Sequence, residues 1–271
     1  MAKTITIVNQ KGGVGKTTTT FNLGSCLAQA GKKVLLVDMD QQGNLTYCMG
    51  HEDPDEVRAT IANLMLQYIA VDEEECRVDD YIFHRKIGGI EMDYMACNVE
   101  MASVETALVN AMQREQILKL ILDEVKERYD YILLDCGPSL GLTTMNSLVA
   151  ADSALIPLKA EKLSSLGMQL LLKNIMRVKR RLNPSLDIEG ILFCAVREKY
   201  TEDIKTIHEV KERFASAINV YDFVVPDLTH VSHSVRDQQP LIVFSEKGIK
   251  KGESYVADIY NQLAQEVIEN E

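Results

Sequence analysis

Phosphate chemistry is indicated by a glycine-rich segment near the N-terminus, made up of Lys11, Gly12, Gly13, Val14, Gly15, Lys16, Thr17 and Thr18. Glycines allow backbone N–H groups to converge on an anion, and the positive end of a following helix adds to the attraction. The segment comes directly after an apolar run that begins at Ile5, so it has the strand, loop and helix order of a P-loop. Lys16 would then contact the β- and γ-phosphates of a nucleotide, and the Thr17 hydroxyl would hold Mg²⁺.

The same segment departs from the strict P-loop pattern. That pattern begins with a glycine, where this chain has Gln10, and the chain carries a second lysine, Lys11, next to it. The result is the deviant Walker A pattern, which is more specific than a glycine-rich turn alone. The alternative interpretation is a glycine turn that binds nothing.

Two aspartates follow later apolar runs. Asp40 comes after the run Val34–Val37, and Asp135 follows Ile132–Leu134. In a parallel sheet, ligands sit beyond the carboxyl ends of the strands, so we expect both aspartates to lie near the phosphate loop. Asp135 has the Walker B form and would hold Mg²⁺ directly or through water. Asp40 is predicted as a further metal residue and as the group that orients or deprotonates the attacking water. Each could instead cap a helix or complete a turn.

These residues need a scaffold of alternating strands and helices. Strands are expected at 4–9, 34–37, 90–96, 131–134, 154–157, 188–195 and 221–225, and helices at 17–30, 60–69, 113–128, 164–182, 201–217 and 252–268. This alternation predicts an α/β fold with a mostly parallel twisted sheet and helices on both faces. We expect a single domain over residues 1–271, with a peripheral acidic excursion at about 50–88 that includes Asp72–Glu75.

Composition narrows the class of protein. The chain has a net charge of −11 and six scattered cysteines without a C-x-x-C pair, which is typical of reduced thiols in a cytosolic protein. The N-terminus enters a strand directly and no apolar stretch reaches the ~18 residues of a membrane helix. We therefore expect a cytoplasmic protein. The acidic balance argues against a surface that is basic everywhere, while still allowing a local basic patch.

A family resemblance follows from several segments together. They are KGGVGKTTT from Lys11, VLLVDMDQQGNLT from Val34, MACNVEMASVE from Met95, YDYILLDCGPSLGLTTMNSLVAAD from Tyr129, RRLNPSLDIEGIL from Arg180 and VVPD from Val224. The chain resembles the ParA/Soj-type partition ATPases of the MinD-related deviant Walker A group, nearly from end to end. The resemblance implies slow, partner-stimulated ATP hydrolysis with Mg²⁺, a nucleotide site that includes Pro226 and Asp227, and a homodimer that sandwiches ATP. In that dimer Lys11 would reach the partner subunit's nucleotide.

The resemblance also implies partners. We expect non-specific binding to double-stranded DNA, association with the nucleoid when ATP is bound, and a ParB-like centromere-binding protein that stimulates hydrolysis. The DNA that such a system segregates would be a plasmid, a chromosome or a mobile element. Because the loop begins at residue 11, we expect no N-terminal DNA-binding domain and no operator-specific repression by this chain. Three departures from the family affect these expectations: Gln41, Gly137, and the loop after Pro226, which lacks the family's arginines.

The expected helix at 164–182 offers a replacement surface for DNA. Leu171, Ile175, Val178 and Leu182 recur at helical spacing and predict its buried stripe. The DNA-binding residues would be Lys173, Arg177, Arg180 and Arg181 on this helix, together with Lys199 and Arg236. Lys205, Lys247, Lys250 and Lys251 could extend the patch. The alternative is a solvated helix face with no ligand.

Other classes of function remain alternatives. A MinD-like membrane-binding protein needs a basic amphipathic C-terminal helix, whereas this chain ends in the acidic sequence QEVIENE, so we expect no membrane partner. An ATP-dependent scaffold that positions protein cargo would share the same ATPase core. Cys97 and Cys136 are interpreted as buried thiols rather than ligands of an iron–sulfur cluster.

Overall fold

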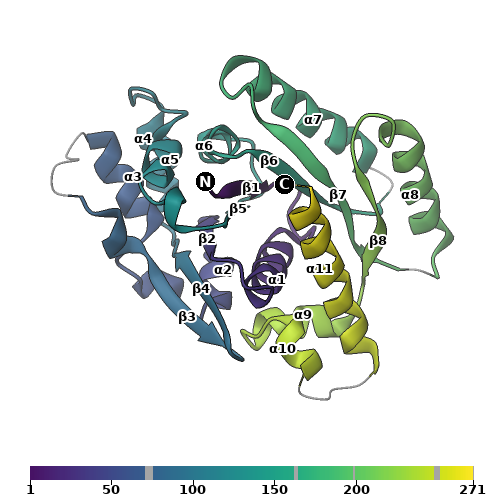
Figure 1. Ribbon diagram of the computed structural model, residues 1–271. Coiled ribbons are helices and arrows are strands. Elements are labelled where there is room, and N and C mark those ends of the chain that lie inside the picture. Colours follow the sequence, from purple (N-terminus) through teal and green to yellow (C-terminus); the bar gives the residue numbers. More distant parts are fainter. Residues whose placement is uncertain (71–75, 162–163, 198, 247–250, 271) are drawn as a thin grey trace.

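The computed structural model describes residues 1–271 except 71–75, 162–163, 198, 247–250 and 271 (Figure 1). Four expectations fall on positions outside this part: the acidic run 72–75, the patch residues Lys247 and Lys250, and the very end of the C-terminal tail at residue 271.

The centre of the molecule is an eight-stranded sheet within the described residues, in the order β3-β4-β2-β5-β1-β6-β7-β8. Its strands are β1 Lys3–Ile7, β2 Val34–Met39, β3 Phe83–Ile87, β4 Ile90–Met95, β5 Tyr131–Cys136, β6 Ser153–Lys159, β7 Asp187–Val196 and β8 Val220–Pro226. Every neighbouring pair is parallel except β3 and β4, which form an antiparallel hairpin at one edge. The predicted mostly parallel α/β fold is confirmed.

Helices cover both faces of this sheet (Figure 1). One face carries α1 Lys16–Gln29, α2 Asn44–Cys48, α9 Thr229–Arg236, α10 Leu241–Glu246 and α11 Lys251–Glu269. The other carries α3 Ile61–Ala70, α4 Met101–Leu108 and α5 Ile117–Asp123 over one half, and α6 Leu142–Ala150, α7 Ser164–Arg181 and α8 Thr201–Phe214 over the other half. Short 3₁₀ turns lie at Pro54–Glu56, Val78–Tyr81 and Lys126–Arg128.

Strand β2 shows how the sequence produces this layering. Val34 and Leu36 pack into the core beneath α1, whereas Leu35, Val37 and Met39 pack into the core beneath α3 to α5. All six residues of the strand are buried. A continuous apolar run is what a strand needs when helices cover it on both sides.

Several elements differ from the sequence expectation. The helix expected over 113–128 is only α5, Ile117–Asp123, followed by the 3₁₀ turn Lys126–Arg128, and α4 and α6 were not predicted. Strand β3 was also missed, because its sequence FHRKI places three consecutive polar residues between Phe83 and Ile87 and so gives no continuous apolar run. The segment at about 50–88 supplies this edge strand and α3, in which Ile61 and Leu64 are fully buried.

Candidate functional site

Three neighbouring central strands place the predicted site residues together at the carboxyl ends of the strands. Strand β5 lies between β2 and β1, with Asp38 opposite Asp135 on one side and Ile7 opposite Asp135 on the other. The phosphate loop leaves β1 just beyond Ile7, and Asp40 follows directly after β2. Parallel pairing therefore brings the loop, Asp40 and Asp135 together from positions far apart in the chain.

Left-handed glycines shape the phosphate loop. Gly13 has φ 67° and Gly15 has φ 96°, a region that residues with a Cβ rarely occupy. A Cβ at Gly15 would also lie 3.3 Å from the Cβ of Cys194. Helix α1 starts right after Gly15, without a side-chain cap and without an acidic residue in its first turn. Its first N–H groups and the positive end of its dipole are thus directed at the loop, which is the arrangement of an anion site.

Lys16 is directed into this loop rather than into solvent. Its side chain is buried, with the residue only 7% exposed, and its Nζ lies 3.3 Å from the backbone oxygen of Lys11. The Thr20 hydroxyl donates to the backbone oxygen of Lys16 at 3.0 Å and lies 3.4 Å from Asp135 Oδ1. A buried ammonium next to converging N–H groups gives the loop a strongly positive interior, which suits a polyphosphate.

Asp135 provides the negative counterpart. The residue is fully buried, and its Oδ2 has no hydrogen-bond partner in the described part of the chain. Burial, followed by the charge of Asp38, raises the pKa of Asp135 well above its ordinary value, while hydrogen bonding from Thr17 and the charge of Lys16 act in the opposite direction. A buried, unpartnered carboxylate oxygen is costly unless a cation satisfies it.

The residues present fit an Mg²⁺ ion. Mg²⁺ in nucleotide sites is usually held by one or two carboxylates together with substrate phosphates and water. Asp135 and the Thr17 hydroxyl would supply the protein ligands beside the phosphate loop. Among the described residues there is no cluster of three or more His, Cys, Asp or Glu side chains placed to hold a metal by themselves, so phosphate oxygens would have to complete the shell.

Asp38 and Thr46 form a buried network beneath Asp40 that sequence reasoning did not find. Asp38 Oδ2 accepts from the Thr46 backbone N–H at 2.8 Å and from its hydroxyl at 2.7 Å, and Asp38 Oδ1 accepts from the Asp40 N–H at 3.1 Å. The Thr46 hydroxyl in turn accepts from the backbone N–H of Cys97 at 2.8 Å. Burial raises the pKa of Asp38 to about 6 although these hydrogen bonds oppose the shift. No sequence pattern links Thr46 to Asp38 in advance.

Asp40 sits in a tight turn that faces Gly137. Its Oδ1 accepts from the Gln42 N–H at 3.1 Å, and the residue is 7% exposed. A Cβ at Gly137 would lie 3.3 Å from this Oδ1. The glycine at 137, where the family pattern has a proline, therefore lies directly against Asp40, and it leaves that carboxylate more room than a bulkier residue would.

Pro226 and Asp227 lie on the other side of the phosphate loop. They line a cavity of about 230 Å³ together with loop residues, and the whole lining is Gly13, Val14, Gly15, Thr18, Lys159, Cys194, Ala195, Val225, Pro226, Asp227, Leu228, Val231 and Tyr260. Ala195 has φ 52°, an uncommon backbone conformation for alanine, at the point where β7 meets this cavity. The structure thus places Pro226 and Asp227 next to the loop, and their role in nucleotide binding stays a prediction.

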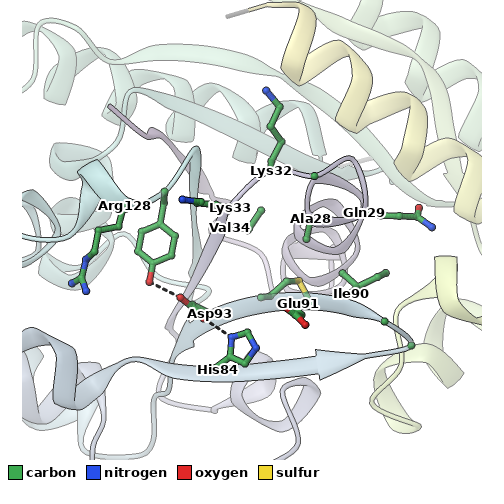
Figure 2. A pocket seen from close by; sticks show the side chains of 15 residues that line it. Ala28, Gln29, Lys32, Lys33, Val34, His84, Ile90, Glu91, Asp93 and Arg128 are labelled. Atoms are coloured by element: carbon green, nitrogen blue, oxygen red, sulfur yellow. Dashed lines mark hydrogen bonds and ion pairs between the residues drawn. The ribbon is translucent and has the colours of Figure 1, made fainter.

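A larger cavity of about 710 Å³ lies away from this chemistry (Figure 2). Its lining includes Val34 and Ile90, the first residues of β2 and β4. The cavity therefore opens at the amino ends of these strands, whereas the phosphate loop lies at their carboxyl ends. Asp93 there lies beside His84, as Figure 2 shows, and contacts its Nδ1 at 2.8 Å. Asp93 also accepts from the Tyr129 hydroxyl at 2.8 Å. None of the predicted site residues lines this cavity.

Lys11 has a different environment from Lys16. Its ammonium forms an ion pair with Glu161, a residue between β6 and α7 that sequence reasoning missed. Its backbone N–H donates to Asn9 Oδ1 at 3.0 Å. The Lys11 side chain is 46% exposed. It therefore points outward from the loop, while Lys16 points inward.

The predicted DNA-binding residues do not form one group. Lys173, Arg177, Arg180 and Arg181 are all exposed on α7. Lys199 is exposed near the start of α8. Arg236 lies on α9, which packs on the opposite face of the sheet from α7, and it pairs with Asp237.

The packing of α7 confirms most of its predicted stripe. Leu171, Ile175 and Val178 are buried, as expected. Leu182 was predicted to be buried, and this was wrong, because it lies just beyond the end of α7 and is 38% exposed. Two of the helix's arginines, Arg177 and Arg181, border a cavity of about 340 Å³ against α6.

Two further expectations concern cysteines and membranes. Cys97 and Cys136 are free and buried, and burial raises the pKa of both thiols, which agrees with their interpretation as core thiols. In the described part of the chain, no helix combines the length and the apolar character that crossing a bilayer requires.

Comparison with known proteins gives consistent matches. A family profile described as an AAA domain matches residues 2–188. The chain is 39% identical over 271 residues to the sporulation initiation inhibitor protein Soj of Bacillus subtilis, covering 100% of both chains. It is 36% identical over 260 residues to the chromosome partitioning protein ParA of Myxococcus xanthus, covering 95% of this chain and 86% of that protein.

A solved structure shows the same fold with nucleotide. Cobyrinic acid a,c-diamide synthase from Mycobacterium smegmatis, with a bound ATP analog and magnesium, superposes with a TM-score of 0.76 at 30% identity, covering 88% of this chain and 92% of that one.

Proposed function

The chain belongs to the Soj and ParA family of partitioning ATPases, and from that premise we propose that it is an Mg²⁺-dependent ATPase that dimerises around ATP, binds DNA non-specifically and moves a DNA cargo with a ParB-like partner. The observation that carries the proposal is the meeting of an uncapped α1, the buried Lys16 and the unpartnered Oδ2 of Asp135 at one sheet edge. A phosphate ligand that carries Mg²⁺ would provide acceptors for the N–H groups of α1 and for Lys16, and a cation for Asp135.

Each residue of the loop has a distinct role in nucleotide binding. The N–H groups at the start of α1 bind phosphate oxygens, and Lys16 neutralises charge on the β- and γ-phosphates. Thr17 and Asp135 would hold Mg²⁺, which would supply positive charge to offset the negative charge that develops during transfer. Pro226 and Asp227 line a cavity beside the loop, from which they would contact the remainder of the nucleotide.

Asp40 is the group we assign to the attacking water. Its carboxylate lies after β2 at the same edge, held by the turn to Gln42 and supported from below by Asp38. Phosphoryl transfer depends on positioning and charge neutralisation rather than on a strong base. With one oxygen fixed by the turn, the other is left to orient a water molecule. Gly137 lies against this carboxylate but has no side chain to pack on it, so we expect a slow basal rate.

The second lysine supports a dimer. Lys11 points away from its own loop, unlike Lys16, and its side chain is about half exposed. In an ATP-sandwich dimer Lys11 would reach the partner's nucleotide and stabilise transferred charge in trans, as an arginine finger does. Two such sites would form together, because each subunit supplies one lysine to the other.

DNA and protein partners extend the proposal. The exposed basic face of α7, carried by Lys173, Arg177, Arg180 and Arg181, supports contact with phosphates without base readout. Lys199 is a weaker candidate for the same role, and Arg236 would need a separate contact because it lies on the other face. The ATP dimer would then associate with the nucleoid, and a ParB-like partner would stimulate hydrolysis and release it.

Sizing by light scattering tests the proposal directly. We expect a monomer with ADP, a dimer with ATP and Mg²⁺, and a complex of the dimer with non-specific duplex DNA. Asp40→Ala should accumulate as an ATP dimer with little turnover, because it binds nucleotide but cannot orient water. A monomer under all nucleotide conditions would refute the dimer, and wild-type turnover in Asp40→Ala would remove Asp40 from its role.

A further inference from the structure

Lys11 is engaged within its own subunit. Its ammonium pairs with the carboxylate of Glu161, which lies after β6 and three residues before the start of α7. Both side chains remain about half exposed, at 46% and 47%. To reach a nucleotide in another subunit, the ammonium would have to turn away from this contact.

The backbone around Lys11 is fixed, so only its side chain has to move. The Lys11 N–H donates to Asn9 Oδ1 at 3.0 Å, and the Asn9 amide donates to the Pro157 backbone oxygen at 2.7 Å. The Lys11 backbone oxygen accepts from Lys16 Nζ at 3.3 Å. Releasing the ammonium from Glu161 would therefore leave the phosphate loop in place.

Glu161 retains other cations when Lys11 leaves. Its pKa is lowered first by hydrogen bonding from Lys11, and then by the charges of Lys11, Lys159 and Arg197. Lys159 and Arg197 are not part of the Lys11 contact, so they would still provide positive charge near the carboxylate after Lys11 leaves. Because the pair is exposed, its strength is also small, and opening it costs little.

We propose that Glu161 acts as a latch that holds Lys11 in its own subunit and competes with the partner's nucleotide for it. The inference rests on the proposed ATP-sandwich dimer and adds a positioning residue to it. Each dimer requires two latches to open, so the latch raises the protein concentration needed for dimerisation. It also keeps the exposed lysine from unproductive contacts while the chain is monomeric.

The test is the dimer dissociation constant of the full chain with a non-hydrolysable ATP analogue and Mg²⁺, measured by analytical ultracentrifugation for wild type and Glu161→Gln. Exposed pairs of this kind shift an equilibrium by about 1.4- to 5-fold, so two of them predict a dimer constant about 2- to 30-fold tighter in the variant. The difference should shrink as salt is raised, because screening weakens the latch only in wild type. Glu209→Gln, an exposed glutamate on α8, is the matched control and should dimerise as wild type does.

A second measurement needs no dimer. Acylation of the Lys11 amine in the nucleotide-free chain, followed by mass spectrometry with Lys33 as internal reference, should be several-fold faster in Glu161→Gln than in wild type. Equal acylation rates, or equal dimer constants in a wild type that does dimerise, would overturn the latch. A wild type that stays monomeric with the analogue, alongside faster acylation in the variant, would instead refute the proposed dimer while leaving the contact itself established.

Discussion

The phosphate-loop edge of the sheet and the basic face of α7 present charge in opposite ways. At the sheet edge, Lys16, Asp38 and Asp135 are buried, and each is restrained by strand register or by named hydrogen bonds. On α7, Lys173, Arg177 and Arg180 are exposed, with no ion-pair partner in the part of the chain that the structure describes. The first region is a preorganised binding site, whereas the second is an exposed patch of positive charge.

This contrast determines how each region responds to change. Charges in a buried site interact strongly and are poorly screened, so removing one affects all the others. Exposed charges interact weakly with their own protein and contribute to a ligand's binding almost independently. We therefore expect single substitutions to abolish function at the sheet edge and only to reduce it on α7.

The largest effect is expected for Lys16→Ala. Removing a buried ammonium that faces phosphate leaves the ligand's charge uncompensated, at a cost of roughly 2–5 kcal/mol, or about 30- to 4,000-fold in Kd for ATP. Isothermal titration calorimetry measures this directly. Lys33→Ala, at the opposite edge of the sheet, is the control and should bind ATP as wild type does. A Kd for ATP in Lys16→Ala that stays close to the wild-type value would contradict the assigned site.

The pH dependence of stability is the next test. The pKa of Asp38 is about 6 in the folded chain against an ordinary value of 3.8, so the folded state binds more protons than the unfolded state between these values. Its contribution to the unfolding free energy is therefore favourable to folding at low pH and is lost as pH rises through about 4 to 6, by at most roughly 3 kcal/mol.

Asp38→Asn isolates this effect, because asparagine keeps an oxygen for Thr46 and does not titrate. Urea denaturation of the nucleotide-free chain at pH 4.5 and 7 should show that the variant gains stability relative to wild type as pH rises. A variant-to-wild-type difference that is the same at both pH values would show that Asp38 is not held in a site that disfavours its charge.

Asp135 should couple metal binding to pH. Because burial and Asp38 raise its pKa, the residue must lose a proton before it can hold Mg²⁺, so Mg²⁺ affinity in the presence of ATP should increase with pH. Asp135→Asn should flatten the pH dependence and weaken Mg²⁺ binding by at least about 10-fold, the loss typical of removing even an outer-shell partner. The measurement is the Mg²⁺ affinity of the wild type and the variant in the presence of ATP, obtained by Mg²⁺ titration at pH 5.5, 6.5 and 7.5. An unaltered pH profile in the variant would place the metal elsewhere.

The smallest effect per residue is expected on α7. Replacing Lys173, Arg177 and Arg180 by Glu should weaken binding to random duplex DNA and reduce the salt slope by about 1 for each phosphate that is no longer neutralised, or about 3 in total. Filter binding between 50 and 200 mM salt measures the slope. A triple Glu variant of Lys32, Lys33 and Lys86, which lie near the opposite sheet edge, is the control. An unchanged slope in the α7 variant would move the DNA surface to another face.

Much of the site was predictable because its signals are local. Gly13 and Gly15 adopt left-handed backbone conformations that favour glycine. Asp40 and Asp135 follow apolar runs that are typical of strands buried on both faces. The expected meeting of these residues needed one additional rule, that parallel strands share a carboxyl edge. Glu161 and Thr46 were not predictable, because their partners Lys11 and Asp38 are distant in sequence or follow no recognisable spacing.

The sequence by itself determined the fold class, the phosphate loop and the aspartates at strand ends. These features are set by the spacing of apolar residues and the positions of glycines, which control backbone conformation over only a few residues. Only the tertiary structure decided which charges are buried, which are paired and which share a face. It separated Arg236 from α7, exposed Leu182, and set Lys11 against Glu161 while Lys16 turned inward. The place of Arg236 depends on how helices dock across the sheet, the exposure of Leu182 on where α7 ends, and the Lys11 contact on which loops meet beyond β1 and β6. Each of these sums many weak contacts between distant segments that no local pattern encodes.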